Sequence, residues 1–116
     1  MSSAHLFAGV AVGDLDTSRD FYERLLGREP DLVPNEHEAA WQLHAGAWIV
    51  LIAGEETLGA TQHTLLVDDL DAFLDAARRR GIEPGPIEPV GDEMLQSIVV
   101  DPDGNRLKVA ARAPAS

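Results

Sequence analysis

Apolar and polar residues along the chain follow two periodicities, and the first half of the chain shows both. Short strands are predicted where apolar residues alternate with polar ones or run together, at 5–12, 30–34, 39–45 and 47–53. Between the first two strands, one apolar helix face is formed by Phe21, Tyr22, Leu25 and Leu26. We expect this helix to begin at the capping residues Asp16–Ser18 and to end at Gly27.

The second half of the chain repeats this plan. Strands are predicted at 62–67, 83–89, 93–100 and 106–111. The helix between the first two has an apolar face formed by Leu70, Phe73, Leu74 and Ala77, and it ends at Gly81. Because three prolines fall within 83–89, we expect an edge strand or an extended loop there. The segment Asp101–Asn105 is typical of a tight turn.

A sequence repeat links the two halves directly. The segment Ala11–Asp16 recurs as Leu66–Asp71, with an offset of 55 residues. A repeat of this length implies two copies of one β-α-β-β-β module. We therefore predict an α+β fold in which two curved sheets, each with its helix on the convex side, enclose a cleft. Because each half alone is short, we expect modules 5–53 and 62–111 to share one core within a single domain, 1–116.

Charge and composition limit the classes of partner. The chain carries 20 acidic and nine basic residues, which argues against nucleic acid, because phosphate binding needs basic patches. Its one basic cluster, Arg78–Arg80, falls at the end of a predicted helix, and we interpret it as a solvated helix terminus. No apolar run is long enough to cross a membrane, and no signal peptide is evident. The absence of cysteine suits a reducing compartment, and we expect a cytoplasmic protein.

Four segments carry a resemblance to a known family: Val12–Gly27, Val67–Asp71, Arg80–Ile82 and Asp101–Asn105. Together they resemble the vicinal oxygen chelate superfamily, which includes glyoxalase I, bleomycin-resistance proteins, fosfomycin-resistance enzymes and extradiol dioxygenases. The resemblance spans roughly residues 5–111 and implies the glyoxalase/bleomycin-resistance fold. Because small members of this family commonly pair to complete their clefts, it also implies a homodimer.

The resemblance further implies four positions at which enzymes of the family hold a divalent metal. In this chain those positions are occupied by Phe7, Val50, Gln62 and Lys108. Hard divalent cations need oxygen or imidazole ligands, which phenylalanine and valine do not offer, and an ammonium group repels the ion. Glutamine alone does not hold a metal. We therefore predict neither a metal site nor a cofactor.

The remaining candidates for catalysis are interpreted as structural. The four histidines, at positions 5, 37, 44 and 63, show no metal-ligand spacing. Strand alternation turns His63 to the sheet face opposite that of its neighbour Gln62. Asp14 and Asp69 stand at strand-to-helix junctions, where carboxylates satisfy free helix N–H groups. We predict no catalytic residue.

Seven residues are our candidates for a ligand site: Phe7, Trp41, Trp48, Gln62, Met94, Gln96 and Lys108. Trp41 and Trp48 flank a predicted hinge at Gly46, and indole rings stack on aromatic or cationic ligands. Core packing is the alternative interpretation for both tryptophans and for Met94. Lys108 either binds an acidic group, pairs with a carboxylate in the cleft, or extends its stem past apolar surface.

These residues lead to a functional hypothesis. We predict a metal-free, homodimeric protein that binds a small molecule in an aromatic-lined cleft. The ligand is expected to be an antibiotic or another aromatic or cationic metabolite, which places antibiotic resistance among the predicted roles. One alternative is a vicinal oxygen chelate enzyme of the lyase, isomerase or dioxygenase type with non-standard catalytic residues. Another is a structural or regulatory dimer without a ligand.

Overall fold

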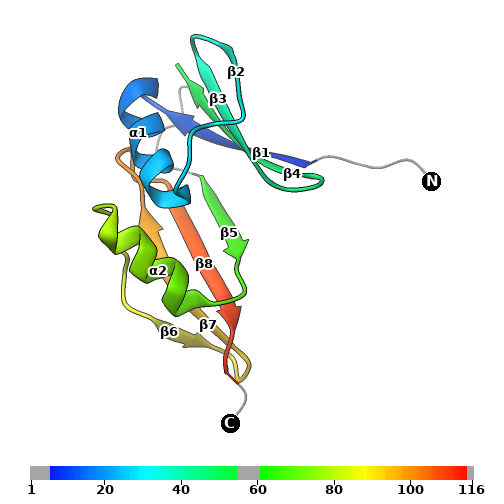
Figure 1. Ribbon diagram of the computed structural model, residues 1–116, viewed down its shortest axis with the longest axis vertical. Helices are drawn as coiled ribbons and strands as arrows, with labels where there is room; N and C mark the ends of the chain where they lie inside the picture. The colour runs from blue at the N-terminus through cyan, green and yellow to red at the C-terminus, as the bar shows by residue number, and fades with distance from the viewer. Residues whose placement is uncertain (1–5, 55–60, 115–116) are drawn as a thin grey trace, which may run out of the picture.

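The computed structural model describes residues 6–54 and 61–114, and it contains two modules of the predicted order (Figure 1). The first module consists of β1 (Leu6–Val12), α1 (Leu15–Leu26), β2 (Leu32–Asn35), β3 (Glu38–His44) and β4 (Ala47–Ala53). The second consists of β5 (Gln62–Leu66), α2 (Leu70–Arg79), β6 (Glu88–Val90), β7 (Met94–Val100) and β8 (Arg106–Arg112). His5, which we expected to open the first strand, lies outside the described residues.

Each module folds its strands into one four-stranded sheet with the same topology. The strand orders are β1-β4-β3-β2 and β5-β8-β7-β6. In each sheet the first and last strands of the module pair in parallel, and the other pairs are antiparallel. This arrangement confirms the predicted α+β fold with two βαβββ modules. The proline-rich segment forms a short edge strand, β6, in place of the longer one that 83–89 allowed.

The helices begin and end for reasons that the sequence partly shows. Helix α1 starts earlier than predicted, because Asp14 adopts the extended N-cap conformation. Contrary to our expectation, its carboxylate accepts no hydrogen bond from a helix N–H and accepts instead from the Thr17 hydroxyl at 2.6 Å. The expected cap at Asp16–Ser18 was therefore wrong. At the matching position of α2, the Asp69 carboxylate caps the helix by accepting from the Ala72 amide. Gly27 ends α1 in the left-handed region, at φ 81°.

One hydrophobic core draws on both modules. Alternate residues of the central strands face the helices, so Val10 of β1 and Leu51 of β4 pack against α1, and Val109 of β8 packs with α2. The largest fully buried side chains of the core are Trp41 and Tyr22. The opposite face of each sheet carries no helix, and we call these two surfaces the outer faces.

Polar contacts of the turn between β7 and β8 join the second module to the first. The Tyr22 hydroxyl of α1 donates to Asp101 at 2.9 Å, and the Asn105 amide donates to the Ala11 carbonyl at 2.8 Å. Asp103 accepts from the Gly13 amide at 3.2 Å. Burial, together with the neighbouring Asp101 carboxylate, raises the pKa of the Tyr22 hydroxyl, which therefore remains a donor. We call this set of contacts the junction network.

Arg80 adds a second connection between the modules, at the ends of the two helices. Its guanidinium donates to the carbonyl oxygens of Arg24 at 2.5 Å and Leu25 at 3.4 Å, which have no partner within α1. The interpretation of Arg78–Arg80 as a solvated helix terminus is therefore wrong for Arg80. The side chain binds the C-terminus of the other helix, where a cation complements the macrodipole.

The junction network predicts a large cost for removing Asn105. Its side chain makes three hydrogen bonds to Ala11, Asp101 and Thr61, and the residue is only 2% exposed. Asn105→Ala leaves these buried partners unsatisfied, so we expect the free energy of unfolding to fall by about 2–4 kcal/mol. Chemical denaturation measures this change.

Asn35→Ala is the matched control for this measurement. Asn35 also binds a backbone amide, that of His37, but it is exposed to solvent. We expect its loss to cost less than about 1 kcal/mol, because water replaces the missing bond. Equal losses for the two variants would contradict a special role for the junction network.

Candidate functional site

The outer face of the first sheet carries a stacked aromatic pair. Phe7 of β1 and Trp48 of β4 are register partners, and their rings stack with centroids 5.6 Å apart and planes 22° from parallel. Phe7 is 57% exposed. The indole Nε1 of Trp48 is buried and has no hydrogen-bond partner among the described residues. This face therefore presents aromatic surface, while the unpartnered indole N–H lies beneath it.

The two tryptophans lie on opposite faces of the same sheet. Trp41 pairs with Ile49 and faces the helix, where it is fully buried and donates from Nε1 to the Arg28 carbonyl at 2.9 Å. Trp48 pairs with Gln42 and faces outward. For Trp41 the structure supports the alternative of core packing, and the ligand interpretation rests on Trp48.

The predicted site residues of the second module share the other outer face. Leu107, Val109 and Ala111 of β8 belong to the core. Lys108 alternates with them and faces outward, as do its register partner Thr64 on β5 and its partner Ile98 on β7. By the same register, the outer face also carries Gln62, Met94 and Gln96.

The four positions implied for a metal therefore lie on outer faces, two on each sheet. Phe7 and Val50 lie on the first sheet, and Gln62 and Lys108 lie on the second. This donor set does not fit a divalent cation, because it contains one neutral oxygen ligand and one ammonium group. Within residues 6–54 and 61–114, no group of three His, Cys, Asp or Glu side chains is placed to bind a metal.

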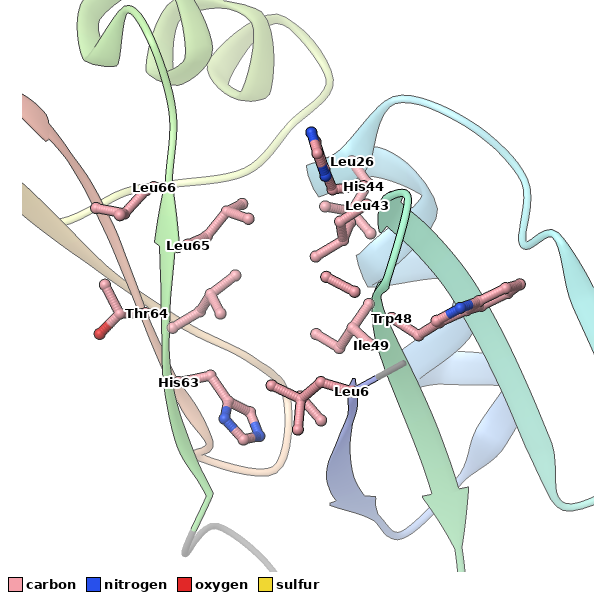
Figure 2. Close-up of a pocket in the computed structure, with 13 residues that line it drawn as sticks. Leu6, Leu26, Leu43, His44, Trp48, Ile49, His63, Thr64, Leu65 and Leu66 are labelled. Carbon is pink, nitrogen blue, oxygen red and sulfur yellow. The ribbon is translucent and has the colours of Figure 1, made fainter. Parts of the chain in front are cut away.

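A pocket of about 440 Å³ lies between the two modules, on the helix side of the sheets. Its walls are mainly aliphatic side chains from β1, β4, β5 and α1, with His44 and His63 at opposite ends (Figure 2). Of the seven predicted site residues, only Trp48 borders it, and Figure 2 shows its ring turned away from the other lining side chains. By strand register Trp48, Thr64 and Leu66 belong to the outer faces, and they also line the pocket, so the pocket adjoins these faces.

One histidine, His63, is placed as strand alternation predicts. His63 points to the face opposite Gln62, and its Nε2 lies 3.1 Å from the Gly9 carbonyl of β1. His44 lies at the end of β3, and His37 lies in an exposed turn beside Glu36. These three side chains are not gathered at one site in the structure.

Exposed apolar side chains follow the two strands that border the pocket. Leu6 on β1 is 71% exposed, and Leu66 on β5 is 68% exposed. Both strands are at the end of their sheets, so each has one edge without a hydrogen-bonded neighbour in the described sheets. Sequence reasoning missed this pocket because its lining residues, such as Leu26 and Leu65, carry no signal beyond ordinary apolar periodicity.

The comparisons with known proteins agree with this geometry. The family model for the Glyoxalase/Bleomycin resistance protein/Dioxygenase superfamily matches residues 3–109. A crystal structure of a glyoxalase/bleomycin resistance protein from Catenulispora acidiphila DSM 44928 is 39% identical, with a TM-score of 0.89, and the alignment covers 97% of this chain and 100% of that one. No curated protein matches the chain.

Two more distant structures share the fold. TnmS3, an antibiotic binding protein from Streptomyces sp. CB03234, is 23% identical with a TM-score of 0.78, and the alignment covers 97% of this chain and 98% of that one. A bleomycin-binding protein complexed with bleomycin is 20% identical with a TM-score of 0.78, and the alignment covers 96% of this chain and all of that one. At these identities the similarity establishes the fold alone.

The placement of the tryptophans predicts different costs for replacing them. Trp41→Leu creates a cavity and leaves the Arg28 carbonyl without its donor, so we expect a loss of about 2–4 kcal/mol of unfolding free energy. Trp48→Leu removes one partly exposed stacking contact, and we expect a loss of at most about 1.5 kcal/mol. Denaturation of both variants measures the difference, and a larger cost at Trp48 would show that our assignment of core and outer face is reversed.

Proposed function

Because this chain belongs to the Glyoxalase/Bleomycin resistance protein/Dioxygenase superfamily, we propose that it binds a small organic molecule on its outer faces without a metal ion or cofactor. The main support for this proposal is the identity of the residues at the four positions where the resemblance implies metal ligands. At the positions where the resemblance implies metal ligands, Phe7 provides exposed apolar surface, Val50 is apolar and buried, and Lys108 provides a positive charge. The site is therefore built for direct contact with an organic ligand.

The aromatic pair supplies the contact surface that this function needs. Stacked rings of Phe7 and Trp48 offer an apolar aromatic surface for a ligand. Gln62, Met94 and Gln96 on the other outer face supply amide donors and an adaptable thioether. An antibiotic-binding protein and a bleomycin-binding protein share this fold, which makes drug sequestration the form of binding that we favour.

We further propose that the protein acts as a homodimer. Each outer face is an open sheet surface, and Phe7, Leu66 and Val100 leave about half or more of their side chains exposed. A second copy that covers these surfaces would turn two half-sites into clefts, and isologous pairing is the commonest way to do so.

None of the described helices is long and apolar enough to span a membrane. We separately propose a cytoplasmic location, which the absence of cysteine suits.

The binding proposal predicts a specific effect of Trp48. In a panel of aromatic compounds that includes bleomycin, we expect at least one to bind and to change the tryptophan emission. Trp48→Leu should weaken that binding by about 1 kcal/mol or more, because the stacking surface is lost. Phe73→Leu on α2 is the control and should bind as the unmodified protein does. Binding that is insensitive to Trp48 would place the ligand elsewhere.

The donor chemistry predicts a protein without stoichiometric metal. Elemental analysis after mild purification should find well below one divalent ion per chain, because the implied ligand set includes an ammonium group. One zinc, nickel or iron per chain that is lost in Gln62→Ala would contradict the proposal and favour an enzyme of the family.

The dimer proposal is tested by the mass in solution. Light scattering at micromolar concentration should give about twice the chain mass of 12.5 kDa. A single species at the chain mass would show that the outer faces remain open in solution.

A further inference from the structure

Four hydrogen-bond donors form a compact block on the outer face of the second sheet. Gln62 of β5 is the register partner of Arg106 on β8, and Thr64 is the partner of Lys108 two residues further along. Because β5 and β8 are parallel neighbours and these positions alternate with core residues, all four side chains project from the same face. An amide, a hydroxyl, a guanidinium and an ammonium group are thus gathered there.

The block is positively charged in a chain whose net charge is −11. The ion pairs found within the described residues use other arginines, at positions 19, 24, 28 and 78. On this outer face the carboxylate is Glu88 of β6, which pairs with Gln96 of β7 and is separated from β8 by that strand. Among the described residues, therefore, no carboxylate is a register partner of the block.

The third cation on the same face of β8 has a different environment. Arg112 borders a depression together with Asp68, Asp69 and Asp71, so its nearest surroundings are acidic. Within the part of the chain that the structure describes, neither Arg106 nor Lys108 forms an ion pair with a carboxylate. Oxyanions are bound by charged donors of this kind, which form shorter and stronger hydrogen bonds than neutral ones.

Apolar side chains flank the donor block on both sides. Ile98 and Val100 of β7 are the register partners of Lys108 and Arg106, and Leu66 of β5 follows Thr64 on the same face. Val100 is 52% exposed and Leu66 is 68% exposed. When the acidic group of a ligand binds the block, the apolar part of the ligand can therefore pack against these neighbouring side chains.

We propose that the block of Gln62, Thr64, Arg106 and Lys108 binds the anionic group of an organic acid, a carboxylate, sulfonate or phosphate attached to an apolar or aromatic body. This inference rests on the proposed function, and it changes the ligand class, because the sequence led us to expect an aromatic or cationic molecule. Lys108 places an ammonium group at a position where the family resemblance implies a metal ligand. In this proposal Arg106 and Lys108 supply the positive charge that a metal ion would supply in an enzyme of the family.

Calorimetric titration with compounds that share a ring system and differ in charge tests this inference. The probes are 2-naphthoate, the neutral 2-naphthalenemethanol and the cationic 2-naphthylmethylamine. We expect 2-naphthoate to bind at least about tenfold more tightly than the neutral compound, and the cation to bind more weakly still. Its affinity should fall as salt is added.

Lys108→Gln and Arg106→Gln should each lower the affinity for 2-naphthoate by a larger factor than the affinity for the neutral compound, so that most of the preference is lost. Arg79→Gln is the matched control, because Arg79 is an exposed cation at the end of α2, away from this face. An equal effect of all three variants would overturn the assignment of the block.

The outcomes separate this inference from the function on which it rests. If the neutral or cationic probe binds as tightly as 2-naphthoate, the protein binds small molecules but the anion proposal is wrong. If none of the three probes binds at millimolar concentration, both proposals fail. Circular dichroism and thermal unfolding of each variant identify any loss that is due to misfolding.

Discussion

Hydrogen bonds from the turn between β7 and β8 fix how the two modules sit together, and the accessibility of both outer faces depends on them. Asp101 and Asn105 are nearly buried, and their partners Tyr22 and Ala11 belong to the first module. Such buried polar contacts cost much free energy when one partner is lost, so they specify one arrangement of the modules. In that arrangement the helix sides of both modules contribute to one core.

The chemistry of the outer faces follows from strand alternation. Alternate residues of β1, β4 and β8, such as Val10, Leu51 and Val109, belong to the core, and the residues between them point to the outer faces. On the first sheet these residues are aromatic and aliphatic, and on the second they are amides, cations and aliphatic side chains. A divalent metal does not suit this set, whereas an organic molecule with an apolar body and a polar end does.

The sequence predicts the fold well because its signals are local and repeated. The repeat around Asp14 and Asp69, the glycine that ends α1 and the alternation in β8 each determine an element without knowledge of the rest. Contacts between the modules could not be predicted from the sequence, because they depend on how distant segments pack together. Arg80 illustrates this limit, since its role appears only when the C-terminus of α1 lies beside it.

For the candidate site, too, the features set by local pattern were predictable and those set by tertiary packing were not. Alternation correctly separated His63 from Gln62, but it did not tell which face of β3 and β4 meets the helix, and so Trp41 and Trp48 remained equivalent. Arg106 was detectable in principle, because it lies two residues before Lys108 on the same strand face. The pocket between the modules had no sequence signal, since aliphatic residues from four elements form most of its wall.

The most direct test asks whether a bound ligand contacts the outer faces or the pocket between the modules. Methyl groups report on both, because Val50, Ile98 and Val100 lie on outer faces, whereas Leu26, Ile49 and Leu65 line the pocket. With selectively labelled methyl groups, we expect nuclear Overhauser contacts from bound 2-naphthoate to the outer-face set. Contacts confined to the pocket set would contradict the account.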